Sequence, residues 1–323
     1  MHQRSTLFLS ALLSVVFAAG CGDPPTSNAI DDAVEPLIRA KHHRVGQPPG
    51  LVVVESNRSF DDTYQTLVDA LEANPNIGVV ATLDHAANAA SVGLELPPTR
   101  EVFFGNPNLG TPLMQRRQTV GIDLPQKMLI WEDDGSVFLS YNSTKYLQWR
   151  HRLTRVGEQL QTIAGALRNF AGLATDNEVD DRVRRMLPRG FRFNGLVFVH
   201  SAFSADETFA RLRAAIDAAP PLNELFALEH DQNAARVGLE LRPTKLVVFG
   251  NPNLGTPLMQ SKRTIGIDLP QKFLVYENRR GDVLIVYNDP FYIAKRHGVR
   301  DRNAQLEIIA GALANLANGA ATP

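Results

Sequence analysis

Apolar and polar residues recur along the chain in an order that predicts the same elements twice. Residues 50–56 and 196–201 are rich in valine and other β-formers and predict strands. After each run, a serine followed three positions later by an acidic residue predicts a capped helix start. In the first copy this helix has one apolar face, made by Phe60, Tyr64, Leu67, Val68 and Leu71.

The pattern then predicts a second strand, a short alanine-rich helix, three more strands and a closing amphipathic helix. In the first copy these are residues 77–83, 85–91, 102–105, 127–131, 137–141 and 156–170. The turn Asp133-Asp134-Gly135 between two β-rich runs is a hairpin signal. The predicted fold is α+β, with helices on one face of a largely antiparallel sheet.

A tandem duplication explains the repeated order, because residues 104–115 and 249–260 both read FGNPNLGTPLMQ. We expect the two copies to pack as a pseudo-two-fold pair, like a dimer made within one chain. The predicted segments are a signal peptide (1–20), an anchor with spacer and lead-in helix (21–49), a first repeat domain (50–172), a linker helix (173–194) and a second repeat domain (195–318).

Identity between the copies is uneven. Residues 50–85 share 14 of 36 aligned positions with the second copy, whereas residues 86–132 share 33 of 47. Something therefore restrains the middle segment in both copies. One explanation is turn geometry, in which Gly105, Gly110 and Gly121 supply positive-φ positions beside prolines. The other is a loop that faces a ligand or partner.

Recurrent polar side chains favour a binding role for these loops, since a turn scaffold alone need not preserve them. We expect them to border a cleft beside apolar groups, in the mixture typical of a ligand pocket. The candidate ligand-binding residues are Asn106, Asn108, Thr111, Met114, Gln115, Asn251, Asn253, Thr256, Met259 and Gln260.

Catalytic signals are weak. His85 and His230 recur at one position, where a hydrogen-bonded or capping histidine is the commoner role, and acid/base work with Asp123, its counterpart Asp268 or Glu95 rests on recurrence alone. The chain has no nucleophile elbow, phosphate-binding glycine loop or metal-ligand spacing. We therefore expect no metal and no cofactor, and an enzyme is the alternative to a binding module or a purely structural protein.

The N-terminus has the layout of a secretory signal peptide, with a basic start and an apolar run over residues 7–19. Ala18-Ala19-Gly20-Cys21 is similar to a lipobox, and Cys21 is the only cysteine of the chain. These features predict a lipid anchor on Cys21 and a place in the cell envelope, on the outer membrane facing the periplasm. Since 33 basic residues balance 34 acidic ones, nucleic acid is not an expected partner.

The Asn-Pro of the repeated block, the following Gly-Ile-Asp-Leu-Pro and the acidic hairpin resemble the domain of unknown function 302 family. The resemblance covers nearly all of both copies. It implies a compact α+β domain of the TATA-box-binding-protein-like β-α-β type that pairs as a dimer, with no established activity to carry over. The expected function is a binding module for a small amphipathic ligand or an envelope partner.

Replacing Cys21 with Ser should release the protein from the membrane fraction, because a serine hydroxyl cannot take the place of the acylated thiol. Fractionation of cells expressing each form measures this. Unchanged membrane association of the variant would contradict the predicted anchor.

Overall fold

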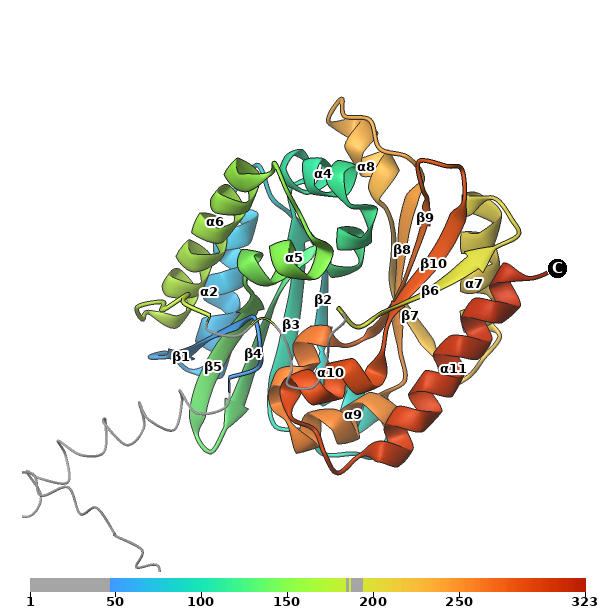
Figure 1. Cartoon of the computed structure of the whole chain (residues 1–323). Helices are drawn as coiled ribbons and strands as arrows, with labels where there is room; N and C mark the ends of the chain where they lie inside the picture. The colour runs from blue at the N-terminus through green and yellow to red at the C-terminus, as the bar shows by residue number, and fades with distance from the viewer. Residues whose placement is uncertain (1–46, 184–185, 187–193) are drawn as a thin grey trace, which may run out of the picture. The chain divides into compact units, whose positions relative to one another are not determined.

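The computed structural model describes residues 47–183, 186 and 194–323. The predicted signal peptide, Cys21 and the lead-in helix lie outside the described residues. Residues 47–323 form one compact unit that contains both repeats (Figure 1). Residues 176–183, in the segment predicted as a linker helix, have no helix.

Each repeat contains five strands in the same order. The first repeat has β1 (Leu51–Ser56), α2 (Phe60–Glu72), β2 (Gly78–Asp84), α3 (His85–Ser91), β3 (Thr99–Gly105), α4 (Pro107–Arg116), the 3-10 helix η1 (Gln118–Asp123), β4 (Gln126–Asp133), β5 (Ser136–Asn142), α5 (Thr144–His151) and α6 (Gly157–Thr175). The second has β6 (Leu196–Ser201), α7 (Ala205–Asp217), β7 (Asn223–Glu229), α8 (His230–Arg236), β8 (Thr244–Gly250), α9 (Pro252–Ser261), η2 (Arg263–Asp268), β9 (Gln271–Glu277), β10 (Val283–Asn288), α10 (Pro290–His297) and α11 (Asn303–Ala321).

The two sheets have matching topology, β1-β5-β4-β3-β2 and β6-β10-β9-β8-β7, with every neighbouring pair antiparallel. The predicted α+β fold in two tandem copies is confirmed. The hairpin at Asp134 and Gly135 is also confirmed, since both residues have positive φ and Asp133 pairs with Ser136.

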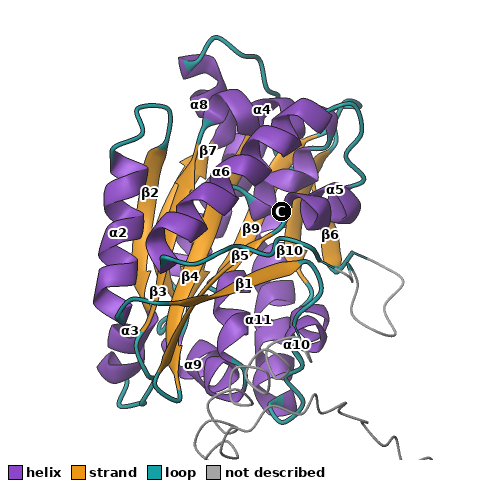
Figure 2. Ribbon diagram, turned by 90° about the vertical axis from the view of Figure 1, so that its left-hand side faces the viewer, coloured by secondary structure: helices purple, strands orange, loops and turns teal. Residues whose placement is uncertain are grey.

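Alternation along the strands gives each sheet two buried faces. In the first repeat, Val102 and Ile130 point to the core beneath α2 and α6, which cover the outer face of the sheet (Figure 2). Phe103 and Leu129 point the other way, toward the second repeat. There the ring of Phe103 meets Phe226 edge-on, with centroids 5.2 Å apart. The sheets therefore lie between outer helical layers (Figure 1).

The repeated FGNPNLGTPLMQ block was expected to form loops, and this is wrong: Pro107–Arg116 is an α-helix, as is Pro252–Ser261. Asn106 is the N-cap, and its side chain accepts a hydrogen bond from the backbone N–H of Asn108. Pro107 occupies the first turn, where a backbone N–H has no helical partner to lose. The Asn-Pro pair is therefore a helix start.

Gly105, Gly110 and Gly121 were expected to supply positive-φ positions in the segment that is most alike in the two copies. None of the three has positive φ. A Cβ on Gly121 would lie 3.0 Å from Leu274 of the other repeat and 3.3 Å from His230. Its counterpart Gly266 would meet Leu129 at 3.1 Å. These two glycines allow close approach of the repeats.

Gly50 is a position where only glycine fits, with φ of +75° and the ring of Tyr146 2.4 Å from where a Cβ would lie. We expect Gly50→Ala to lower the free energy of unfolding by about 3 kcal/mol or more, combining left-handed strain with overpacking. Gly93 has φ of +72° and open space around it, so Gly93→Ala isolates the strain and should cost about 1–2 kcal/mol. Urea unfolding measures both, and equal losses would show that the contact with Tyr146 is unimportant.

Candidate functional site

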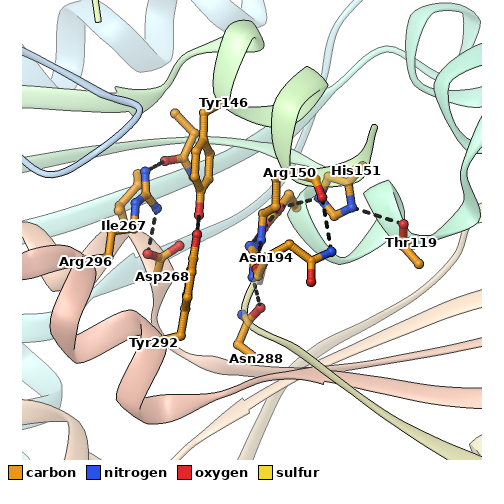
Figure 3. Close-up of polar contacts among 12 residues, drawn as sticks. Thr119, Tyr146, Arg150, His151, Asn194, Ile267, Asp268, Asn288, Tyr292 and Arg296 are labelled. Atoms are coloured by element: carbon orange, nitrogen blue, oxygen red, sulfur yellow. Dashed lines mark hydrogen bonds and ion pairs between the residues drawn. The ribbon is translucent and has the colours of Figure 1, made fainter. Parts of the chain in front are cut away.

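Two arginines cross the boundary between the repeats (Figure 3). Arg150 on α5 contacts Asp123 of its own repeat at 2.9 Å and donates to Asn288 of the second repeat at 2.7 Å. Arg296 on α10 contacts Asp268 at 2.7 Å, and donates in return to Asn142 of the first repeat at 2.6 Å. The repeats therefore exchange the same contact in both directions, as a pseudo-two-fold pair does.

A histidine joins each arginine and aspartate to form a buried cluster, one in each repeat. His151 lies 2.7 Å from Asp123, and His297 lies 2.8 Å from Asp268. Burial alone would raise the pKa of Asp123, but Arg150 and His151 outweigh burial and hold that pKa well below its usual value. Burial lowers the pKa of His151. Asp123 and Asp268, named from sequence as candidate acids, are thus ionised partners of a buried arginine.

Tyrosine side chains separate the two clusters. The hydroxyls of Tyr146 and Tyr292 point toward each other, 3.4 Å apart (Figure 3). The guanidinium of Arg296 lies over the Tyr146 ring, 3.9 Å from its centroid. Sequence reasoning noticed that His151 and His297 correspond but missed the tyrosines and arginines before them. The signal exists, because Tyr, three residues, then Arg-His recurs at residues 146–151 and 292–297.

Two cavities lie at equivalent positions between the repeats. The first, of about 730 Å³, is lined by residues 104–111 and Met114 of the first repeat and by His230, Asn233 and Arg236 of the second. The second, of about 270 Å³, is lined by the α9 segment of the second repeat and by His85, Asn88 and Ser91 of the first. Helix α4 packs against α8, and α3 against α9. Each cavity therefore takes its walls from both repeats.

Most of the residues predicted to bind ligand line one of these cavities. In the first they are Asn106, Asn108, Thr111 and Met114; in the second they are Asn251, Thr256 and Met259. Gln115 and Gln260 do not line them.

The two glutamines instead hold the repeats together. Gln115 donates to the backbone carbonyl of Glu240, and Gln260 donates to that of Glu95, both at 2.7 Å. Asn253 lies outside the second cavity lining and bonds to the N-cap Asn251.

Several buried polar atoms on the cavity walls have no hydrogen-bond partner within residues 47–183, 186 and 194–323. The hydroxyls of Thr111 and Thr256 are unpartnered at the same position of the two repeats, and their residues are 0% and 1% exposed. Gln126 in the first cavity has an unpartnered Nε2. Buried polar groups in native proteins are nearly always hydrogen-bonded, so these atoms are free to bond to a water or to a polar group of a molecule in the cavity.

The recurrent histidines have different surroundings. His230 Nε2 donates to the carbonyl of Gly121 at 3.1 Å, and burial lowers the pKa of His230 to about 4, so the ring is neutral near pH 7. His85 Nε2 has no hydrogen bond, and lies 3.8 Å from the buried carboxylate of Glu101. Lys127 lies 3.1 Å from the same carboxylate, in a geometry that forms an ion pair but no hydrogen bond.

Neither Asp123 nor Glu95 is paired with His85. Sequence reasoning missed Glu101, whose signal is a charge in the apolar strand β3. The second repeat has Leu246 at this place. Within the described ranges, no group of three or more His, Cys, Asp and Glu side chains is arranged to hold a metal ion.

In a comparison with known families, one family model matches both repeats. The model of "Domain of unknown function DUF302" matches residues 52–170 and again residues 197–316. A solved structure of an uncharacterized conserved protein DUF302 from Bacillus stearothermophilus covers 39% of this chain and 98% of its own, at 17% identity and a TM-score of 0.36.

Curated relatives are similar over part of the chain. The proteins named fluoride-specific ion channel FluC 1 of Brucella suis and FluC 2 of Brucella melitensis are 38% identical over 141 residues, which is 43% of this chain. The match spans 55% and 52% of those proteins, so the chain covers about half of their length. Of the helices in the described part of this chain, none has the length and apolar character to cross a bilayer.

The lowered pKa of His230 predicts a specific pH dependence. Its folded-state pKa is about 4, against about 6.5 in an unfolded chain, so the folded state binds fewer protons between these values. Stability from this residue is therefore complete above pH 6.5 and falls as the pH decreases toward 4. Between pH 7 and pH 4.5 the loss should be about 2 kcal/mol.

We expect His230→Gln to remove that part of the pH dependence, while His200→Gln, at an exposed histidine, leaves it unchanged. Urea unfolding of the three proteins at both pH values measures the difference. An identical pH dependence in His230→Gln and the parent protein would contradict the assignment.

Proposed function

This chain belongs to the DUF302 family, and we propose that it binds small amphipathic molecules in the two cavities between its repeats. The observation that carries the proposal is the repeated presence, in equivalent cavities, of a largely apolar wall with an unpartnered threonine hydroxyl. Ligand pockets typically combine apolar walls with a few placed polar groups, over roughly 300–1,000 Å³. The first cavity lies in this range, and the second is just below it.

The distribution of sequence identity supports the same site. Residues 86–132 and 231–277 are the segments most alike in the two copies. Each contains the helix that forms a wall of one cavity, α4 or α9, and most of the short helix that lines the other cavity, α3 or α8. The identity between the copies was explained either by backbone geometry or by contact with a ligand. Asn106 and Asn251 fit both explanations, since each caps a helix and also lines a cavity. Helix geometry and ligand contact therefore favour the same residues.

We further propose that the protein acts in the cell envelope as a lipoprotein anchored through Cys21. The signal-peptide layout and the lipobox-like sequence support this location. A binding site for amphipathic molecules fits a compartment bounded by lipid. The alternative is that the protein binds another envelope protein instead of a small molecule.

A second candidate function, acid/base catalysis, is favoured by one observation only. His85 lines the second cavity with an unbonded Nε2, and Glu101 with Lys127 lies behind it. A histidine without a hydrogen bond on one ring nitrogen is a candidate general base, although Glu101 makes no hydrogen bond that would orient this ring. Hydrolysis of a simple ester such as p-nitrophenyl butyrate that is lost in His85→Gln and kept in His230→Gln would favour this function over binding alone.

Filling either cavity should remove one binding site. Ala166 lines the first cavity from α6, and Ala312 lines the second from α11. We expect Ala166→Phe and Ala312→Phe each to lower the stoichiometry of the neutral fluorescent probe N-phenyl-1-naphthylamine from two per chain to one, because the added ring occupies the site. Fluorescence titration of the anchor-free protein measures this.

Ala164 provides the matched control, since it lies on α6 but does not line the cavity. Ala164→Phe should bind the probe as the parent protein does. Circular dichroism melting of all three variants verifies that they remain folded. Unchanged stoichiometry in both cavity variants would place the probe elsewhere and refute the proposal.

A further inference from the structure

We propose that the first cavity selects an anionic amphipath, a molecule with an apolar body and a carboxylate or phosphate head, and that Arg236 contacts the head. The inference rests on the proposed binding function and assigns a ligand class to one of its two sites. Three features of the first cavity carry it: an unpaired cation, unpartnered buried hydrogen-bond groups and the start of a helix.

The cation is Arg236, at the end of α8. It is the one lysine, arginine, aspartate or glutamate among the described residues that line the first cavity. Within the part of the chain that the structure describes, no ion pair neutralises it. Its Nη1 donates to Asn233 Oδ1 at 3.1 Å, which holds the guanidinium beside a second lining residue. His230 contributes no charge near pH 7, because burial keeps its ring neutral. The cavity therefore carries a net positive charge.

Buried groups deeper in the wall also favour an acceptor. Gln126 is 7% exposed, and its Nε2, which can only donate, has no partner among the described residues. Thr111 is fully buried, with an unpartnered hydroxyl that can donate. An anionic oxygen accepts several such bonds at once, and charge-assisted hydrogen bonds are stronger than neutral ones.

Helix α4 adds a third contribution. Its N-cap Asn106 and its first residues line this cavity. The N-terminus of a helix carries partial positive charge, which favours a nearby anion through the helix dipole. Its first N–H groups already bond to Asn106 and give the anion no direct hydrogen bond. The apolar body of the ligand would pack against Phe104, Ile163 and Leu167 on the same walls.

The second cavity keeps the helix and the threonine but not the cation. Ser91 occupies the position equivalent to Arg236, and its hydroxyl donates to the carbonyl of Asn88. The charged group on this wall is Glu224, which is paired with Arg213 at 2.8 Å. An anionic head would therefore be disfavoured here, and the two sites differ in selectivity.

The experiment compares dodecanoate with dodecan-1-ol, which share a chain length and differ in head charge. Each displaces N-phenyl-1-naphthylamine from the anchor-free protein at low salt. We expect Arg236→Gln to weaken dodecanoate about fivefold, the scale of a partly exposed charge contact, and to change dodecan-1-ol less than twofold. Ser91→Arg should strengthen dodecanoate binding at the second site. Lys145→Gln, an exposed change outside both cavities, controls for net charge.

Equal affinity for dodecanoate in Arg236→Gln and the parent protein, with the probe still bound and displaced, would overturn the anion assignment and leave the binding function standing. An equal loss for dodecanoate in Lys145→Gln would also overturn it, since the effect would then be long-range charge. If the parent protein takes up no probe and neither amphipath, the proposed function fails and this assignment fails with it.

Discussion

The reciprocal contact of Arg150 and Arg296 is the constraint on which the rest of the molecule depends. A guanidinium removed from water needs a counter-ion and partners for its remaining N–H groups. Each repeat provides the counter-ion, Asp123 or Asp268, but the amide that completes the shell comes from the other repeat. A single repeat cannot supply this shell from its own side chains, so both arginine clusters depend on the pairing of the repeats. The cavities, whose walls come from both repeats, exist only because of it.

Local periodicity was enough to predict most of the fold. The capped start at Ser59, the apolar face of α2 and the hairpin at Asp134 and Gly135 all depend on residues close in sequence, and the structure has each of them. The errors occurred where the cause is remote or ambiguous. Asn-Pro can open either a turn or a helix, and the reason for Gly121 is a leucine that lies across the repeat boundary.

Sequence recurrence pointed to the segment that lines the cavities, but it did not distinguish what each of its residues contacts. Thr111 lines a cavity, whereas Gln115, four residues later, bonds to the other repeat. Recurrence could not separate them, because contact with a cavity and contact with the partner repeat both restrain a residue. Arg236 and Glu101 were missed for the opposite reason, since neither recurs, and only the structure gives them neighbours.

The composite walls of the cavities have an evolutionary consequence. In a dimer of identical chains, any mutation in a wall appears in both sites at once, so neither site can change alone. Fusion of the two copies into one chain removes that restriction, because the codon for Arg236 and the codon for Ser91 mutate independently. Gene duplication thus permits one site to acquire a new preference while the other keeps the ancestral one, within an unchanged symmetric framework.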